Sequence, residues 1–560
     1  MGESKQKPCR LEDGTYTMNL TNSKTIILLT IVIVVTIAFL WPDFSVKPTK
    51  STGKQTVLEQ DVPQGHVRKY RFVVEDDDSV NRLRPSEQKH LNSTKIAPGQ
   101  TTLIAKDDEQ YLAILGRLAE LGIRPRGTIE ALRSINVILD DATLAKLKNE
   151  FDEISDAKDT IVWIPEDSIE PWSGRLGPSF GSRLLDWLGI DATKENRGGG
   201  VTVAVLDTAI SKSVVNQNAD IKQIDLFNYA QSDGEEGHGN AVASLLVAND
   251  NELTGLAPSI ELLSIPVLDN NGEGSAFDLA MGIIAAVDAG ANVISMSLGS
   301  YTTSPLLKAA IDYAANAGVV MVAASGNDGA KQVLYPAAYD NVIAVGAVDA
   351  SGQIAGFSNT GSEISLAAPG VGINSAWTEG SEITSFSGTS AAVPCVVGVI
   401  ANIMSDYEGT LSPAEAAEQV VNYTIDNGAP NKDDTYGQGV LDYSRAASAD
   451  TPGIFDAAAA GHHIDEENIT ETTVPYIVSA QNTGTETLPT MTLTANVDGV
   501  SQSFTFVDVK PGEVVSSILS ISISQIEANG RVKVSTTVST PNDNRPGNET
   551  KSSTLTYSED

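Results

Sequence analysis

The stretch VTVAVLD, residues 201–207, is a short run of β-branched and apolar residues that ends in a carboxylate. Four comparable runs follow it: ELLSIPVL (261–268), NVISMSLG (292–299), VVMVAAS (319–325) and NVIAVGAV (341–348). Between them, residues 276–290 and 304–318 have the length and composition of helices and end in glycine. Buried strands that alternate with helices predict an α/β fold, a mostly parallel sheet covered by helices on both faces.

The carboxyl ends of parallel strands form the edge at which such sheets bind ligands, and Asp207 lies at that edge. Two later segments, GHGNAVASLLVA and SGTSAAVP, place His238 and Ser390 each at the start of an expected helix. Taken singly, Asp207 and Ser390 are also what a turn or a helix cap requires. Together the three side chains match nucleophilic acyl transfer, in which a base takes the serine proton and a carboxylate orients that base. His238 is the only histidine between His90 and His462, so a serine hydrolase on this sheet has one possible base.

These segments resemble the catalytic domain of the subtilisin-like serine proteases, the subtilases or peptidase S8 family. Six further stretches occur in the family's order: GLAPSIELLSIPVLDNNGEGS, VISMSLG, AASGNDG, YPAAYDNVIAVGAVDASG, FSNTGSEISLAAPG and YGQGVLDYSRA. The resemblance implies a three-layer peptidase domain over residues 176–450 and a serine endopeptidase that hydrolyses peptide bonds through an acyl-enzyme. Asp207, His238 and Ser390 are then the triad, and the side-chain amide of Asn327 donates to the oxyanion.

The resemblance also implies a pocket for the residue on the acyl side of the scissile bond. Its lining residues are Ser297, Leu298, Gly299, Ala324, Ser325, Gly326 and Leu334. Leu334 would shorten this pocket, whereas Asp328 at its rim could attract a basic side chain. These two residues favour different substrates, and the sequence does not choose between them.

Two departures from the family pattern lie close to the triad. Ala209 stands where the family usually has glycine after Asp-Thr, and Gly239-Asn240-Ala241 stands where Gly-Thr-His usually follows the histidine. Neither change touches a triad side chain, but both affect the backbone around it. The alternative reading is a weak or inactive subtilase homologue that acts as a surface peptide-binding or adhesion protein.

Residues 96–173 alternate between strand and helix patterns as a compact α+β module. Its segments INVILDDATLAKLKNEFDE and TIVWIPEDSIEPW are similar to the inhibitory propeptides of the same family. This resemblance implies a zymogen in which the module acts as an intramolecular inhibitor of the cleft. We expect autocleavage near Trp172 to Arg175.

The N-terminal part contains a candidate membrane segment. The run TIILLTIVIVVTIAFLW, residues 25–41, is uncharged and near the lower length limit for a spanning helix. Residues 1–24 precede it as a cytoplasmic segment, and no small-residue cleavage site follows it, which favours an anchor over a signal segment. Residues 42–95 are polar and without periodicity, so we expect a stalk or irregular lead-in. The protease would then lie outside the cytoplasm, either anchored or secreted after processing.

After about Asp450 the helical pattern gives way to alternating strands with turn residues between them. Residues 455–560 therefore predict a β-sandwich, and SAQNTGTETLPTMTLTANVDG resembles Ig-like or CARDB-like adhesion modules. This region could bind a surface ligand or serve as a spacer. His462 and His463 are expected to lie in a linker.

Composition excludes several functions. The formal net charge of −35 argues against a nucleic-acid partner, because phosphate binding needs clustered Lys and Arg. The chain has only two cysteines, Cys9 and Cys395, so a disulfide framework or a cysteine metal site is not expected, and Cys395 is expected to be a buried thiol. The proposed chemistry needs no cofactor. A structural calcium ion at Asp220 is expected only from family habit.

Overall fold

The structure is a computed structural model that describes residues 58–61, 67–76, 96–165, 177–229, 237–249, 253–378 and 383–559. The chain divides into two units, residues 1–55 and 56–560, and every described residue belongs to the second. The predicted membrane segment 25–41, the segment 1–24 and Cys9 lie outside the described residues. So does the expected cleavage position at Trp172 to Arg175.

A seven-stranded sheet forms the centre of the expected peptidase region, residues 176–450. Its order is β14-β13-β12-β11-β7-β9-β8, and every neighbouring pair is parallel. The strands are β7 (Thr202–Asp207), β8 (Asp220–Gln223), β9 (Glu261–Pro266), β11 (Val293–Met296), β12 (Val320–Ala324), β13 (Ile343–Val348) and β14 (Ile364–Pro369). The predicted parallel α/β sheet is confirmed.

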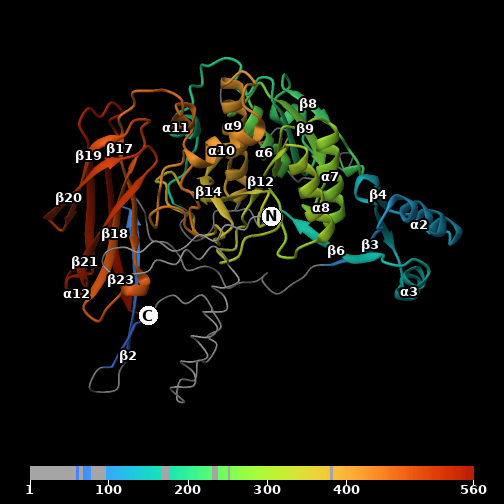
Figure 1. Cartoon of the computed structure of the whole chain (residues 1–560), viewed down its shortest axis with the longest axis horizontal. Coiled ribbons are helices and arrows are strands. Elements are labelled where there is room, and N and C mark those ends of the chain that lie inside the picture. Colours follow the sequence, from blue (N-terminus) through green and yellow to red (C-terminus); the bar gives the residue numbers. More distant parts are fainter. Residues whose placement is uncertain are drawn as a thin grey trace, which may run out of the picture. The chain divides into compact units, whose positions relative to one another are not determined.

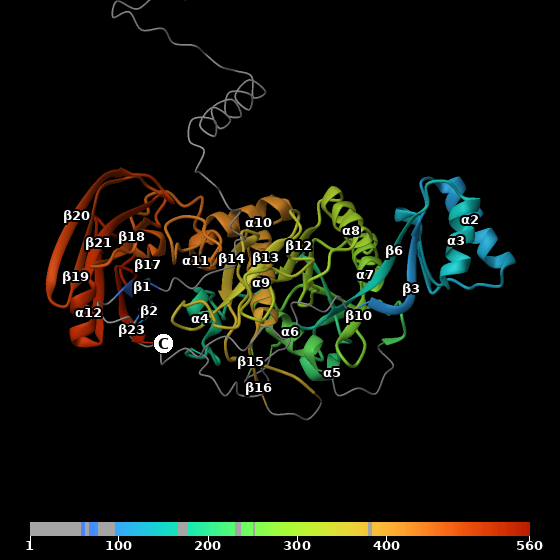
Figure 2. The same ribbon diagram turned by 90° about the horizontal axis from the view of Figure 1, so that it is seen from below.

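Both faces of this sheet are buried, which explains why its strands are continuously apolar. Along β7, Val203 and Val205 enter one core, whereas Ala204 and Leu206 enter the other. Helices α6 (His238–Val247), α9 (Thr389–Asp406) and α10 (Pro413–Asn422) cover the first face, and α7 (Ala276–Asp288) and α8 (Pro305–Asn316) cover the second (Figures 1 and 2). Smaller elements complete the region: α4 (Leu184–Leu188), α5 (Lys212–Val215), α11 (Tyr443–Ala447), and the pair β15 (Ile373–Ser375) and β16 (Thr384–Phe386).

Helix α9 is the only helix among the described residues that is long and apolar enough to cross a membrane. However, 89% of its apolar window is buried within the protein, which is what a central core helix requires. Cys395 lies on this helix as a buried thiol, as predicted, and burial raises its pKa. The apolar character of α9 therefore reflects packing between the sheet and its covering helices.

The N-terminal module contains β3 (Ile96–Ile104), α2 (Asp108–Glu120), β4 (Gly127–Ile129), the 3₁₀ turn η1 (Glu130–Leu132), β5 (Ser134–Ile138), α3 (Asp141–Glu150) and β6 (Ser155–Trp163). Side chains of Asp107 and Asp140 cap its two helices by accepting backbone N–H bonds. Its sheet has the order β10-β6-β3-β5-β4. The edge strand β10 (Glu273–Ser275) comes from the peptidase region, so one sheet joins the two parts.

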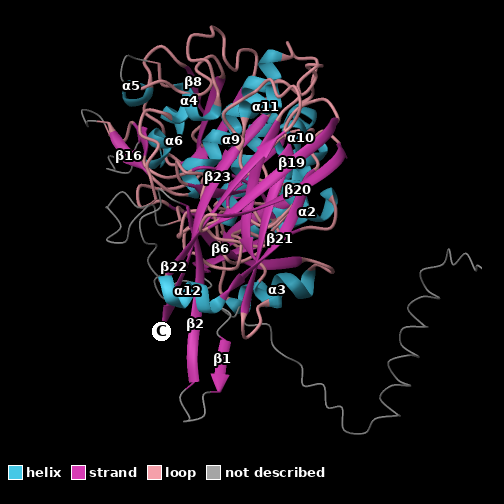
Figure 3. Cartoon of the chain, turned by 90° about the vertical axis from the view of Figure 1, so that its left-hand side faces the viewer, coloured by secondary structure: helices cyan, strands magenta, loops and turns pink. Residues whose placement is uncertain are grey.

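The C-terminal residues form two antiparallel sheets. One is β17 (Ala457–Ile464), β18 (Thr473–Asn482) and β21 (Val514–Ser522); the other has the order β1-β2-β23-β22-β19-β20. The second contains β19 (Leu488–Val497), β20 (Val500–Val509), β22 (Arg531–Ser539) and β23 (Thr550–Glu559), and the short elements η3 (Glu466–Asn468) and α12 (Ile523–Asn529) complete the region (Figure 3). Side chains from both sheets contribute to one hydrophobic core.

Two sequence-based expectations need correction here. Residues 42–95 were expected to be irregular, but they contain β1 (Leu58–Asp61) and β2 (Val67–Asp76), and β2 pairs with β23. An antiparallel neighbour supplies hydrogen bonds to a strand whose own sequence shows no clear alternation. His462 and His463 were expected in a linker, but they lie in β17, whose alanine-rich start and β-bulge hide the strand pattern.

Candidate active site

Asp207 and His238 meet at the carboxyl edge of the sheet. Strand β7 ends at Asp207, helix α6 begins at His238, and the His238 Nδ1 lies 2.8 Å from the Asp207 Oδ1. The same carboxylate oxygen accepts the backbone N–H of Thr208 at 2.7 Å. Both side chains are buried, so the carboxylate acts on the imidazole with little screening by water. The carboxylate orients the ring and favours its protonated form.

The two residues after His238 hold the local backbone in place. A Cβ atom on Gly239 would lie 2.4 Å from the carbonyl oxygen of Thr208, so only glycine fits this close approach. The Gly239 N–H donates to the Thr208 hydroxyl at 2.9 Å. Asn240 accepts the N–H of Ser211 at 2.7 Å and donates to the carbonyl of Trp377 at 2.8 Å. Asn240, at which the sequence departs from the family pattern, thus links the loops of Ser211 and Trp377 beside the histidine.

Ser390 is the second residue of α9. Gly388 precedes the helix with φ of 147°, a backbone conformation that side chains other than glycine rarely adopt. The Ser390 Oγ donates to the carbonyl of Ser297 at 3.4 Å, and the Ser297 Oγ donates to the carbonyl of Ser390 at 2.9 Å. The second bond replaces the helical one, because Pro394, four residues later, has no N–H to offer.

An aromatic contact brings the histidine to the segment that leads into α9. The ring of Phe386 lies edge-on to the imidazole of His238, with 5.6 Å between ring centroids, and Trp377 lies 6.3 Å away in a similar orientation. Helices α6 and α9 cover the same face of the sheet. The site therefore draws together the ends of separate strands and helices, as this class of fold requires.

Asn327 is anchored to the start of α9. Its Oδ1 accepts both the N–H and the hydroxyl of Thr389, each at 2.8 Å. The Thr389 hydroxyl oxygen in turn accepts the N–H of Gly326 at 3.2 Å. With the amide oxygen held by Thr389, the orientation of the Asn327 amide group is set beside the N-terminus of the helix that carries Ser390. A helix N-terminus also favours negative charge.

The predicted pocket residues lie in two segments. Ser297, Leu298 and Gly299 follow β11 directly, while Ala324 ends β12 and is followed by Ser325 and Gly326. Both segments lie next to the start of α9 through the hydrogen bonds just described. Leu334 lies between them, and its side chain is buried.

Asp328 is held by its neighbours at the rim. Its carboxylate accepts the hydroxyl of Tyr301 at 2.5 Å, and its backbone N–H donates to the Asn359 side chain at 3.0 Å. Burial and the Asp328 hydrogen bond raise the pKa of Tyr301. The carboxylate that could have attracted a basic substrate side chain is thus engaged within the protein.

Sequence reasoning missed Asn359 and Thr389 as positioning residues. Asn359 is fully buried, accepts the N–H groups of Asp328 and Ala330, and donates to the Tyr301 hydroxyl at 3.1 Å. It therefore shapes the loop that carries Asn327. The available signal was the FSNTG stretch, which had been noted only as part of the family pattern.

Comparison with known proteins identifies the family of the region that contains these residues. The model of the subtilase family matches residues 198–439. The thermostable alkaline protease of Halalkalibacterium halodurans is 40% identical over 256 residues, which make up 44% of this chain and 68% of that protein. Subtilisin DY of Bacillus licheniformis is 38% identical over 264 residues, 45% of this chain and 92% of that protein.

The chain belongs to the subtilase family.

It is therefore a subtilisin-like serine protease, and proteins or peptides are its class of substrate. Among solved structures, the prenylagaramide maturation protease PagA is similar, with a TM-score of 0.41 and 30% identity over 47% of this chain and 98% of that chain. These matches cover less than half of the chain.

In this subtilase, the end of the N-terminal module lies between the 297–299 segment beside Ser390 and the chain around β10. Trp163 pairs with Gly299 through two backbone hydrogen bonds of 3.0 and 2.9 Å, and the Ile164 N–H donates to the carbonyl of Gly272 at 3.1 Å. Strand β6 also pairs with β10 on its other side. Residues 161–164 thus run as an extended strand between two edges of the peptidase domain, as a bound peptide would.

The calcium site expected at Asp220 stays a prediction. Asp220 is exposed at the start of β8, and the charge of Lys222 acts near it. Among the described residues, no group of three or more His, Cys, Asp or Glu side chains could hold a metal ion.

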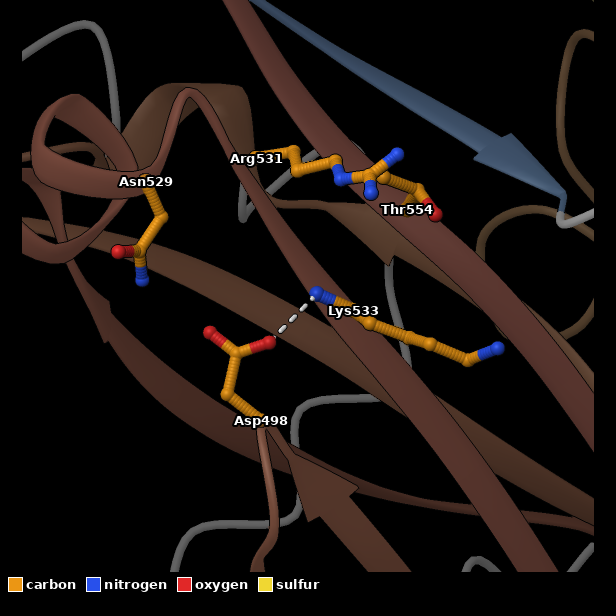
Figure 4. Close-up of a pocket in the computed structure, with 5 residues that line it drawn as sticks. All are labelled: Asp498, Asn529, Arg531, Lys533 and Thr554. Carbon is orange, nitrogen blue, oxygen red and sulfur yellow. Dashed lines mark hydrogen bonds between the residues drawn. The ribbon is translucent and has the colours of Figure 1, made fainter.

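A polar pocket lies on the six-stranded sheet, and its lining residues are distant in the sequence from those of the candidate active site. It is lined by Asp498, Asn529, Arg531, Lys533 and Thr554 (Figure 4). Asp498 accepts the backbone N–H of Lys533 at 3.0 Å, and the Lys533 ammonium points away from that carboxylate. Its two cations, Arg531 and Lys533, are exposed, whereas the polar groups of the candidate active site are buried.

Proposed function

We propose that this subtilase is an active serine endopeptidase whose triad is Ser390, His238 and Asp207. The observation that carries the proposal is the buried 2.8 Å contact between His238 and Asp207 at the sheet edge. A histidine oriented in this way can accept a proton and hold the resulting charge.

The reaction proceeds in two stages. The Ser390 Oγ attacks the scissile carbonyl while His238 Nε2 takes its proton, and Asp207 stabilises the imidazolium. Asn327 and the Ser390 backbone N–H donate to the oxyanion, and each such donor contributes about 3 kcal/mol. His238 then returns the proton to the leaving amine, which breaks the peptide bond and leaves an acyl-enzyme. Water, deprotonated by His238, hydrolyses the ester and restores the Ser390 hydroxyl.

A fluorophosphonate probe tests this proposal, because it labels only an activated serine. We expect labelling of the wild-type protein and none in Ser390→Ala or His238→Ala. Ser405→Ala, on the far end of the same helix, serves as a matched control and should be labelled normally. An unlabelled wild-type protein that still binds peptides would favour the alternative, an inactive surface peptide-binding or adhesion protein.

We further propose that residues 96–173 are an inhibitory propeptide. The pairing of Trp163 with Gly299 supports this, because it lays the module's last strand along a wall of the predicted pocket. Ser297, two residues before Gly299 in the same segment, hydrogen-bonds to Ser390, so this strand lies close to the start of α9. We propose that self-cleavage falls near Trp172 to Arg175, the position expected from the sequence.

Processing can be followed by mass spectrometry of the purified chain. The wild type should shorten to a product that begins within this stretch, whereas Ser390→Ala should stay at full length. The same shortening in Ser390→Ala would show that another protease makes the cut.

We propose that the remaining parts of the chain serve export and membrane anchoring. Residues 25–41 would act as the membrane anchor or signal segment, with the peptidase domain at 176–450 outside the cytoplasm. Cleavage near Trp172 to Arg175 would release that domain from the anchor. Residues 455–560 are proposed as an Ig-like or CARDB-like β-sandwich, supported by the shared core of its two sheets, with surface attachment as one possible role. The proposed chemistry requires no cofactor.

A further inference from the structure

Two glycines of the predicted substrate pocket face the same leucine. A Cβ atom on Gly299 would lie 2.8 Å from the Leu334 Cβ and 2.9 Å from its Cδ1. A Cβ atom on Gly326 would lie 2.9 Å from the Leu334 Cγ. The leucine side chain therefore occupies the space between the two segments that flank Ser390, and only 1% of it is exposed.

The backbone around Leu334 holds the side chain in this space. Its N–H donates to the carbonyl of Ser325 at 3.0 Å, and its carbonyl accepts the N–H of Ala338 at 2.9 Å. The next residue, Tyr335, exchanges two backbone hydrogen bonds of 2.8 Å with Ser300. The leucine is thus tied to both walls, and moving it aside would break bonds to each of them.

A basic substrate side chain gains little at the rim. Reaching Asp328 would require a Lys or Arg to compete with the Tyr301 hydroxyl, which donates to that carboxylate at 2.5 Å. The ring of Trp163 also lies against Tyr301, with 6.4 Å between centroids. Leu334, rather than Asp328, therefore decides which side chains fit.

Resting on the proposed endopeptidase activity, we infer that Leu334 restricts cleavage to bonds that follow a small residue, glycine or alanine. Aromatic, long aliphatic and basic residues on the acyl side are excluded because the leucine occupies the volume that they need. When a pocket is too short for a side chain by several methylene groups, kcat/KM for that substrate falls by at least about 100-fold relative to a substrate that fits.

The test uses purified full-length protein and fluorogenic peptides that differ only in the residue before the scissile bond: Gly, Ala, Leu, Phe or Lys. We expect kcat/KM for Ala to exceed that for Phe and for Lys by at least about 100-fold. Leu334→Gly should raise the rate for Phe and bring the ratio near one. Leu307→Ala, which removes an equally buried leucine from α8, should leave the ratio unchanged.

The outcomes separate the two proposals. A labelled wild-type protein that cleaves after Phe or Lys as well as after Ala would overturn the role of Leu334, whether or not Leu334→Gly folds. A protein that is neither labelled nor active on any peptide would overturn the proposed endopeptidase function, and this inference with it.

Discussion

His238 and His462 are both buried histidines, with 0% and 7% of their surface exposed, but their neighbours differ in kind. His238 contacts the carboxylate of Asp207 at 2.8 Å. Among the described residues, the hydrogen-bond partners of His462 are the hydroxyls of Ser553 at 2.6 Å and Thr536 at 3.0 Å, and its ring lies 5.8 Å from that of Tyr476. Burial, with a smaller contribution from Lys551, lowers the pKa of His462 to about 3.

The difference shows that the partner, and not burial, makes a histidine useful as a base. Burial alone favours the neutral imidazole, because the charged ring loses its hydration. A carboxylate beside the ring offsets that cost and lets the ring hold a proton during a reaction. His462 lacks such a partner and acts as a packing residue between the two C-terminal sheets. Four experiments probe this contrast.

The largest effect is expected from His238→Ala, which removes the proposed base. We expect kcat for a peptide substrate to fall on the order of 10⁵-fold. His462→Gln is the matched control at the other buried histidine and should leave kcat unchanged. Initial rates on one fluorogenic peptide measure both variants, and equal losses would mean that folding rather than chemistry had been disturbed.

Asp207→Asn removes the charge that distinguishes the two sites while keeping the shape of the side chain. We expect a loss on the order of 10⁴-fold in kcat with little change in KM, because the amide cannot stabilise the imidazolium. Thr208→Val, which removes the hydroxyl that accepts from Gly239 but leaves the carboxylate, should cost far less. A similar loss in both would locate the effect in the backbone.

His462 should make the C-terminal sheets sensitive to acid. Its pKa is about 6.5 when unfolded and about 3 when folded, so the neutral ring stabilises the fold fully above pH 6.5. That contribution is lost as pH falls from 6.5 through 3 and amounts to several kcal/mol. Hydrogen exchange of amides in β17 and β18 measures the loss, and His462→Gln should flatten its pH dependence. An unchanged profile would contradict the assignment.

Asp159 extends the comparison to a buried carboxylate that forms no ion pair within the described part of the chain. It accepts the N–H of Phe277 at 3.2 Å and the amide of Asn136 at 2.9 Å across the contact between the module and α7. Burial, with the nearby charge of Asp278, raises its pKa from 3.8 to about 6. The contact is therefore most stable below pH 3.8 and weakens as pH rises through 6, by roughly 2 to 3 kcal/mol.

Hydrogen exchange of β6 and β10 in uncut Ser390→Ala protein measures this smaller effect. Protection should fall as pH rises from 3.8 through about 6, and adding Asp159→Asn should remove most of that fall. A pH dependence that persists in the double variant would assign it to another group, such as Asp278.

Much of the peptidase domain could be predicted from the sequence, because the patterns that indicate its strands span only a few neighbouring residues. The apolar runs that end at Asp207 and Ala324 predict strands buried on both faces, and the lone His238 restricts the choice of base. Strands β1, β2 and β17 could not be predicted, because their regularity comes from pairing with β2, β23 and β18 respectively rather than from alternation in their own residues. For the same reason the sequence predicts a linker at His462, which in fact lies in β17.

The amino-acid sequence by itself determined the α/β class, the three polar groups at the sheet edge and the presence of a module before the peptidase domain, because strand pattern and residue chemistry are encoded over a few neighbouring positions. Only the tertiary structure decided what those groups contact. Gly299 and Gly326 lie against Leu334, and Tyr301 donates to Asp328, although along the chain these three residues lie 35, 8 and 33 residues from Leu334. These contacts form only in the fold, and they decide whether Leu334 or Asp328 governs the pocket. Likewise, the difference between a base and a packing histidine depends on whether folding brings a carboxylate to the ring.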